Sequence, residues 1–204
     1  MDQVASHVHQ HCTEYSRLIY LWTLFGIIHS IFASQTIKGL SEKYLPRVNL
    51  YYRLIYNFFA AFFTGIITAF TFYAPRYVIS DLPTFVNILF YSIQFSGIIF
   101  FIIAMRDYDM ADFLGAGNKQ DVQALKTTGA LGFVRHPFYL AGLLVIWFRE
   151  VTVTSLITNL CLTLYIFIGI KLEEKRLIQQ FGQAYRDYQL RVPMIFPRKP
   201  GKAL

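Results

Sequence analysis

The stretch FYLAGLLVIWFREVTVTSLITNLCLTLYIFIGI, residues 138–170, decides the expected fold. It contains one charged pair, Arg149-Glu150, near its middle. A spanning helix needs about 20 apolar residues, so the stretch is too long for one span. A charged pair is costly inside lipid but is tolerated at a turn in the headgroup layer. The sequence therefore predicts a hairpin of two short membrane helices, at 138–148 and 152–170.

Three more apolar blocks precede the hairpin, at 18–37, 54–74 and 85–105. Each has the length of one spanning helix. The first block is too long for the core of a signal peptide and lacks a basic leader, so we expect it to be retained. The expected fold is an all-α integral membrane protein with five transmembrane helices, the last two forming the short hairpin.

The composition agrees with a membrane protein, because 55% of the 204 residues are hydrophobic and only 15% are charged. Average soluble domains carry about a quarter charged residues. The net charge of +7 does not indicate nucleic-acid binding, since no such motif is present and the aromatic residues lie inside apolar runs. The expected partner is the lipid bilayer, and no feature indicates an oligomeric state.

The placement of basic residues predicts the orientation. Sixteen of the 19 Lys and Arg residues fall in the segments 38–53, 106–135 and 171–202. Cytoplasmic loops are enriched in Lys and Arg. Five spans with the N-terminus outside put all sixteen in the cytoplasm, together with the C-terminus. In a bacterium the membrane would be the inner membrane.

A cytoplasmic amphipathic helix is expected after the hairpin, over residues 171–189. Apolar and aromatic residues recur there at near-helical spacing, with charged residues between them. Pro193, Pro197 and Pro200 then end regular structure.

A first candidate site is Arg135-His136-Pro137. Proline is well placed as the first residue of a helix, so Arg135 and His136 are expected at a helix N-terminus, where free amides attract anions. Basic side chains are unfavourable for the helix there, which makes sense if a ligand carboxylate or phosphate docks between them. The alternative is that both residues contact lipid headgroups.

A second candidate site is Glu173-Glu174, at the cytoplasmic end of the last membrane helix. Adjacent carboxylates there oppose the helix dipole and each other, so they need partners. Lys171, Lys175 and Arg176 are near enough in sequence to be structural partners, and a cationic ligand is the other possibility. Both alternatives stay open from the residues alone.

These residues are parts of a longer pattern that resembles the isoprenylcysteine carboxyl methyltransferase and phospholipid methyltransferase superfamily. The resemblance covers residues 129–197. Its pieces are Arg135-His136-Pro137-x-Tyr139, Glu173-Glu174-x-x-Leu177, Phe181-Gly182-x-x-Tyr185-x-x-Tyr188 and Val192-Pro193.

Shorter and looser motifs in the N-terminal half resemble a narrower branch, the methanethiol S-methyltransferase, NnrU and nurim group. These motifs are His29-Ser30-x-x-Ala33-Ser34, Tyr52-Arg53-Leu54-x-Tyr56-Asn57 and Asp112-Phe113-Leu114-Gly115.

The resemblance implies a methyltransferase that uses S-adenosylmethionine, with the cofactor between the hairpin and the C-terminal helix and reached from the cytoplasm. It implies a thiol as methyl acceptor, with carboxyl or phospholipid amine methylation as alternatives. The implied cofactor-binding residues are Gly132, Val134, Arg135, His136, Pro137, Tyr139, Leu140, Glu173, Glu174, Tyr185 and Tyr188. The implied catalytic residues are Glu174, His29 and Arg135, and the implied substrate residues are His29, Asn57 and Asp112.

The chain is expected to form one membrane domain, residues 1–204. Its parts are an N-terminal tail (1–17), a three-helix half (18–128), a methyltransferase-like cofactor region (129–197) and a C-terminal tail (198–204).

His29 is an ionisable residue in the middle of an apolar block, which makes it a candidate for function. It could bind the acceptor or remove the proton of an acceptor thiol. The alternative is a neutral histidine bonded to Asn57 or Gln94. Asp112 is either substrate-facing, by resemblance, or an interfacial cap.

Two other kinds of function remain as alternatives: a non-catalytic membrane scaffold related to nurim, and a haem-dependent polyene isomerase with His29 as haem ligand. The Arg-His-Pro and Glu-Glu elements argue against both. A metal site is not expected, because His7, His9, His11 and Cys12 are interpreted as part of a mobile tail.

Overall fold

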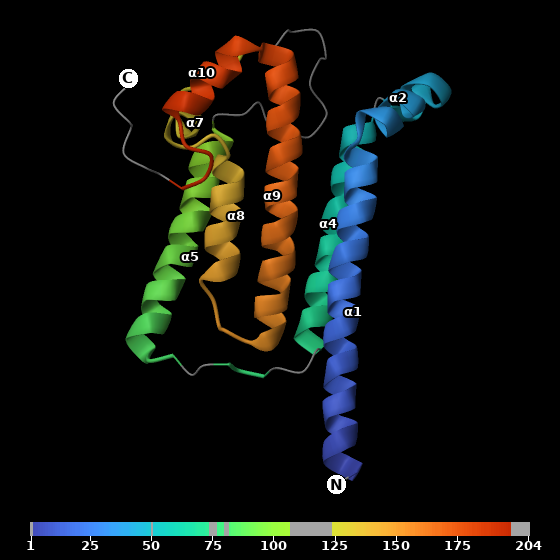
Figure 1. Cartoon of the computed structure of the whole chain (residues 1–204), viewed down its shortest axis with the longest axis vertical. Coiled ribbons are helices and arrows are strands. Elements are labelled where there is room, and N and C mark those ends of the chain that lie inside the picture. Colours follow the sequence, from blue (N-terminus) through green and yellow to red (C-terminus); the bar gives the residue numbers. More distant parts are fainter. Residues whose placement is uncertain (1, 50, 74–76, 80–81, 107–123, 197–204) are drawn as a thin grey trace. The chain divides into compact units, whose positions relative to one another are not determined.

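The computed structural model describes residues 2–49, 51–73, 77–79, 82–106 and 124–196 (Figure 1). The regular structure in these segments is entirely α-helical, with one isolated β-bridge between Val78 and Thr152. The all-α prediction is thus confirmed for them. The helices are α1 (Asp2–Ala33), α2 (Gln35–Tyr44), α3 (Pro46–Asn49), α4 (Tyr52–Tyr73), α5 (Thr84–Met105), α7 (Ala130–Phe133), α8 (Pro137–Trp147), α9 (Val153–Phe181) and α10 (Gln183–Arg191).

Four of these helices contain segments long and apolar enough to cross a membrane: Thr13–Ala33, Leu54–Thr71, Thr84–Met105 and Val153–Phe181. The chain is therefore an integral membrane protein. The fifth expected membrane helix is α8, which is apolar but has only 11 residues. Its length of about 16 Å, at about 1.5 Å per residue, is about half of a typical hydrocarbon core.

Helix boundaries differ from the prediction at three places. The first span, expected over 18–37, ends at Ala33, because Ser34 caps the separate helix α2. Helix α1 begins at Asp2, so most of the expected N-terminal tail is helical. The cytoplasmic helix expected over 171–189 is not one helix, because α9 runs to Phe181 and α10 begins at Gln183. Gly182 between them has φ +57° and ψ −126°, a positive-φ conformation that glycine adopts without a Cβ clash.

The chain forms two compact units, which we describe separately. The first contains residues 1–81, 111–117 and 150–162. Leu18 and Trp22 of α1 pack on Ile67 of α4 at its centre. Helix α9 starts here with reciprocal capping: the Thr152 amide donates to the Ser155 hydroxyl (2.8 Å), and the Ser155 amide donates to the Thr152 hydroxyl (3.0 Å). These bonds satisfy helix-start amides that have no backbone partner.

The second unit contains residues 82–110, 118–149 and 163–204, and α9 continues into it. Helices α5 and α8 approach closely at Gly97, where an added Cβ would lie 2.8 Å from the Cβ of Leu144. The Gln94 side chain donates to the Val145 carbonyl at 2.9 Å, satisfying a carbonyl near the end of α8. The core of this unit consists of Val134, Leu140, Leu143, Ile170 and Ile195.

Candidate functional site

Residues 134–136 connect α7 to α8 and are held by the chain that follows α10. The Arg135 amide donates to the Pro193 carbonyl (2.9 Å), and the His136 amide donates to the Met194 carbonyl (3.1 Å). Val134 and Ile195, on either side of this pairing, are fully buried. The backbone under Arg135 and His136 is therefore fixed by two hydrogen bonds and an apolar anchor.

Helix α8 begins at Pro137, as the sequence predicted. His136 is its N-cap residue, with φ −125° and ψ 69°, and the His136 side chain makes no capping hydrogen bond. The imidazole is instead buried between the two glutamates of α9. Arg135, immediately before it, also reaches α9.

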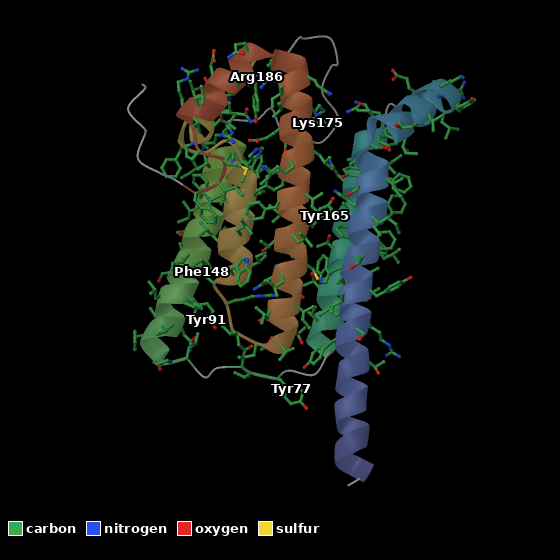
Figure 2. All side chains as sticks on the ribbon, in the orientation of Figure 1. Tyr77, Tyr91, Phe148, Tyr165, Lys175 and Arg186 are labelled. Carbon is green, nitrogen blue, oxygen red and sulfur yellow. The ribbon has the colours of Figure 1, made fainter. Side chains whose placement is uncertain are left out.

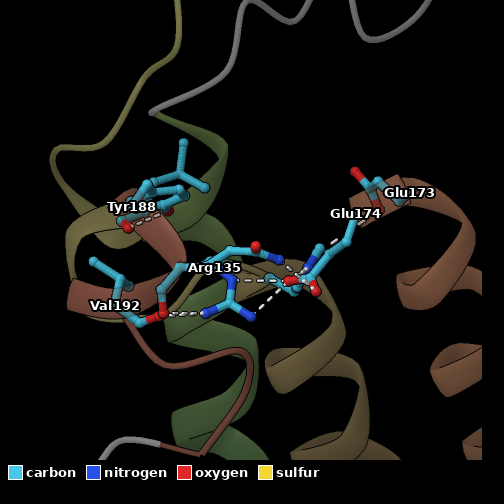
Figure 3. Close-up of polar contacts among 8 residues, drawn as sticks. Arg135, Glu173, Glu174, Tyr188 and Val192 are labelled. Atoms are coloured by element: carbon cyan, nitrogen blue, oxygen red, sulfur yellow. Dashed lines mark hydrogen bonds and ion pairs between the residues drawn. The ribbon is translucent and has the colours of Figure 1, made fainter. Parts of the chain in front are cut away.

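Glu174 is the centre of the polar network (Figure 3). Its Oε1 accepts from Arg135 Nε at 2.8 Å and lies 2.7 Å from Arg135 Nη2. His136 Nε2 lies 3.2 Å from the same oxygen. Its Oε2 accepts from Gln189 Nε2 at 3.0 Å. Both carboxylate oxygens are therefore occupied by donors from the protein, in an arrangement that favours the ionised form.

Arg135 also binds two backbone carbonyls near the end of α10. Its Nη1 donates to the carbonyl of Gln189 at 3.1 Å and to the carbonyl of Val192. The Arg135 and Glu174 side chains are 9% and 10% exposed. The guanidinium thus joins the start of α8, the middle of α9 and the end of α10.

Glu173 has a different environment, although it is the neighbour of Glu174. Its side chain is 33% exposed, and its Oε2 lies 3.7 Å from His136 Nδ1, beyond hydrogen-bond distance. His136 therefore lies between two carboxylates, one buried and bonded and one open to solvent. Lys171, Lys175 and Arg176, weighed as partners from sequence, are all exposed; Figure 2 labels Lys175 on α9.

Two buried tyrosines of α10, Tyr185 and Tyr188, lie beside this network. Their rings meet edge to face, with centroids 5.7 Å apart. The Tyr188 hydroxyl donates to the Leu131 carbonyl, whereas the Tyr185 hydroxyl, on a residue 1% exposed, has no hydrogen-bond partner among the described residues. Burial raises the pKa of Tyr188 to about 12 and also raises the pKa of Tyr185, with the Glu174 charge adding to the effect there. Both phenols are neutral donors at physiological pH.

The remaining residues expected at the cofactor site surround this network in different ways. Tyr139 is half-buried, with its ring centroid 5.6 Å from that of His136. Val134 and Leu140 are core residues, Pro137 is the first residue of α8, and Gly132 is exposed on α7. The structure thus gathers the Arg-His-Pro and Glu-Glu elements into one site, with apolar residues beneath it.

His29 lies in the other unit and is described by itself. Its Nε2 is hydrogen bonded to the Tyr56 hydroxyl of α4, and the two ring centroids are 4.6 Å apart. Phe25 stacks beside it at 5.3 Å. Asn57 is half-buried on α4, and Asp112 lies outside the described residues. The side chains of His7, His9, His11 and Cys12 also lie outside them.

Sequence reasoning missed Gln189, which binds Glu174 through its side chain and Arg135 through its carbonyl. A signal was available, because Tyr185, Tyr188 and Gln189 share one face of a helix at the spacing i, i+3, i+4. A polar residue inside that stripe could have been expected to have a buried partner. Tyr56 was also missed as the partner of His29.

Comparison with known proteins finds similarity to methanethiol S-methyltransferases and confirms the predicted resemblance to that branch. This chain is 47% identical over 72 residues to the methanethiol S-methyltransferase of Pseudomonas deceptionensis, and this match covers 33% of this chain and 28% of that protein. It is 42% identical over 82 residues to methanethiol S-methyltransferase 1 of Bradyrhizobium diazoefficiens, covering 40% and 29%. It is 40% identical over 73 residues to the methanethiol S-methyltransferase of Crocosphaera subtropica, covering 35% and 29%.

In each of these comparisons the chain spans less than a third of the relative's length. No protein-family model and no solved structure matches the chain.

Proposed function

We propose that this protein is an S-adenosylmethionine-dependent membrane methyltransferase that methylates a small or lipophilic thiol. The observation that carries the proposal is the difference in environment between the two neighbouring glutamates. Glu174 is fully engaged by protein donors, while Glu173 faces a partly exposed site lined by His136. The names of the similar proteins support a thiol as the acceptor.

The residues present fit S-adenosylmethionine, which carries a carboxylate, an ammonium and a sulfonium. Glu173 would hold the ammonium, and the Tyr139 ring would offer an aromatic face to a cation. The buried Tyr185 hydroxyl has no partner in the described part of the chain and would donate to a polar group of the cofactor. The positive end of the α8 helix dipole, at Pro137, would attract the carboxylate.

When bound, the cofactor supplies an electrophilic methyl group. The protein's residues would position the acceptor in line with this methyl group and exclude water, since methyl transfer depends on in-line alignment. The Arg135–Glu174 pair would keep α8, α9 and α10 in one geometry. His29 would take the proton of the acceptor thiol, and Asn57 and Asp112 would help to hold the acceptor.

The proposed topology has five membrane helices, with α8 and the start of α9 as the short hairpin. The N-terminus would lie outside and the C-terminus in the cytoplasm, which would put residues 132–140 and 171–192 at the cytoplasmic face. The basic segments 38–53, 106–135 and 171–202 support this orientation.

One observation favours a second candidate, a non-catalytic scaffold. The contacts of Arg135 described above are all to groups of the protein itself, which a purely structural clamp would also require. A haem-dependent isomerase has less support, because the His29 nitrogen Nε2 is engaged by Tyr56.

Calorimetric titration of S-adenosylmethionine into the detergent-solubilised protein tests the proposal. We expect saturable binding that Glu173→Gln weakens at least tenfold, while Glu150→Gln, at an exposed glutamate of the α8–α9 turn, leaves it unchanged. Absence of binding by the wild-type protein would favour the scaffold. A Soret band abolished by His29→Ala would favour the isomerase.

The acceptor is tested by transfer of a labelled methyl group to small thiols, prenylcysteines and phospholipids. We expect label on thiols, and a raised acceptor KM in His29→Ala. Label on a carboxyl or amine group instead would keep the reaction class and refute the thiol.

A further inference from the structure

Helix α2 leaves the membrane-spanning helix α1 at a defined corner. Ser34 has extended backbone angles (φ −69°, ψ 145°), and its hydroxyl accepts from the Ile37 amide at 3.3 Å, which caps α2. Figure 1 shows α2 turning away from the paired helices α1 and α4. The spanning segment of α1 ends at Ala33, and that of α4 begins at Leu54. Chain connectivity therefore puts α2 at a boundary of the membrane.

One face of α2 is apolar, although the helix as a whole is polar. Ile37, Leu40 and Tyr44 follow the spacing i, i+3, i+7, so they form one stripe at about 100° per residue. Leu40 is 46% exposed and Tyr44 is 66% exposed. Leu45, directly after the helix, is also exposed. This stripe is only partly covered by the first unit.

The charged residues of α2 have an ordered placement around the stripe. At about 100° per residue, Lys38 and Lys43 lie on its two opposite sides, and Glu42 lies across the helix from it. The Lys43 ammonium lies 5.1 Å from the centre of the Tyr44 ring. Arg47, in the following helix α3, is exposed and adds a third cation. Lys43 therefore borders the apolar stripe, Lys38 lies about 100° around the helix from Ile37, and Glu42 is farthest from the stripe.

We propose that α2 lies flat in the headgroup layer of the bilayer that α1 and α4 span, and binds anionic phospholipid headgroups there. The stripe of Ile37, Leu40 and Tyr44 enters the acyl boundary. The stems of Lys38 and Lys43 extend along the two sides of the helix, so their ammonium groups reach the phosphates. Glu42 faces water.

This order of charges favours a lipid surface as the partner, because Glu42 then points away from the anionic headgroups. A soluble protein partner would not require an acidic residue to lie opposite the stripe. The three cations against one acid also match an anionic leaflet, where each basic residue near the surface adds about a fivefold preference. The inference does not depend on the proposed catalytic activity.

Fluorescence quenching in nanodiscs tests the proposal on the full chain. A background with Cys12→Ser and Cys161→Ser receives either Leu40→Cys or Glu42→Cys, each labelled with an environment-sensitive nitrobenzoxadiazole. The nanodiscs contain phosphatidylcholine alone or with phosphatidylglycerol. We expect the label at 40 to be quenched by spin-labelled lipid and shielded from aqueous iodide, and the label at 42 to show the reverse.

The charge arm uses Lys38→Gln with Lys43→Gln, compared with Lys175→Gln with Arg176→Gln as a matched control at exposed basic residues of α9. We expect the first pair to raise iodide quenching at 40 at least threefold in discs with phosphatidylglycerol, and the control pair to leave it unchanged. Inorganic phosphate added to the protein in detergent should not shield the label.

Equal iodide quenching at 40 and 42 would overturn the flat orientation. Anionic lipid as the ligand would be overturned by either of two results. The label at 40 could be equally shielded with and without phosphatidylglycerol, or free phosphate could shield it in detergent.

Discussion

Arg135 and Glu174, 39 residues apart in the sequence, form a buried pair in which one carboxylate oxygen lies 2.8 Å from Nε and 2.7 Å from Nη2 of the guanidinium. The other side of the guanidinium binds the carbonyls of Gln189 and Val192. A planar fork is required for this, since a single ammonium cannot reach the carboxylate and both carbonyls together. The pair therefore links the start of α8 to α9 and to the end of α10.

Arg135→Ala should lower the free energy of unfolding by about 3–5 kcal/mol, because it leaves the Glu174 charge buried without its partner. Arg135→Lys should lower the free energy of unfolding by less, since lysine keeps the positive charge but lacks the planar fork of the guanidinium. Arg186→Ala is the matched control, at an exposed arginine of α10 that Figure 2 labels. Denaturant unfolding in detergent measures all three. Equal stability of the Arg135 and Arg186 variants would refute the clamp.

Gln189→Leu should weaken binding of S-adenosylmethionine about tenfold, because the Oε2 of Glu174 loses its donor and the carboxylate can turn away from Arg135. Leaving a buried acceptor unsatisfied also costs about 1–3 kcal/mol of stability. Gln183→Leu is the control, since Gln183 on the same helix donates to Asp187 at an exposed position. Calorimetry and thermal melting of both variants give the comparison.

A second substitution separates the hydrogen bond of Gln189 from its packing. Gln189→Glu keeps the shape of the side chain but places a carboxylate against Glu174. We expect weak binding at neutral pH that recovers at acidic pH, where the new carboxyl is protonated and can donate. A loss independent of pH would assign Gln189 to packing alone.

Parts of this architecture could be predicted from sequence because they depend on local patterns. Span positions follow from runs of apolar residues, and the start of α8 follows from Pro137. The end of α9 did not follow, since the positive-φ Gly182 interrupts an otherwise continuous amphipathic pattern. The short helix predicted at 138–148 agrees with α8, Pro137–Trp147, within one residue at each end.

The site could be predicted as a set of residues but not as a set of bonds. The Arg-His-Pro and Glu-Glu elements were correctly identified as features that need partners. Lys171, Lys175 and Arg176 were nearest in sequence, but neighbours at one to three positions on a helix do not all face the same side. The observed partners of Glu174 come from other elements, and tertiary packing selects them.

Tyr185→Phe and Tyr188→Phe should have opposite consequences, although the two residues are neighbours on one helix face. Tyr188→Phe leaves the Leu131 carbonyl without its donor and should lower the free energy of unfolding by about 1–2 kcal/mol. Tyr185→Phe removes a buried hydroxyl for which the described segments offer no partner, so stability should stay the same or rise. S-adenosylmethionine binding should weaken in Tyr185→Phe. A destabilised Tyr185→Phe with unchanged binding would contradict this assignment.

The phenol of Tyr188 should also make stability depend on pH in the alkaline range. Burial raises its pKa from 10.0 to about 12, so the unfolded chain loses this proton at lower pH than the folded protein does. The stabilising contribution is fully present below pH 10 and is lost as pH rises from about 10 to about 12. The stability advantage of the wild type over Tyr188→Phe should therefore shrink by about 1 kcal/mol between about pH 8 and about pH 11. Denaturant unfolding at the two pH values measures it, and a constant or growing advantage would show that the folded state does not raise this pKa.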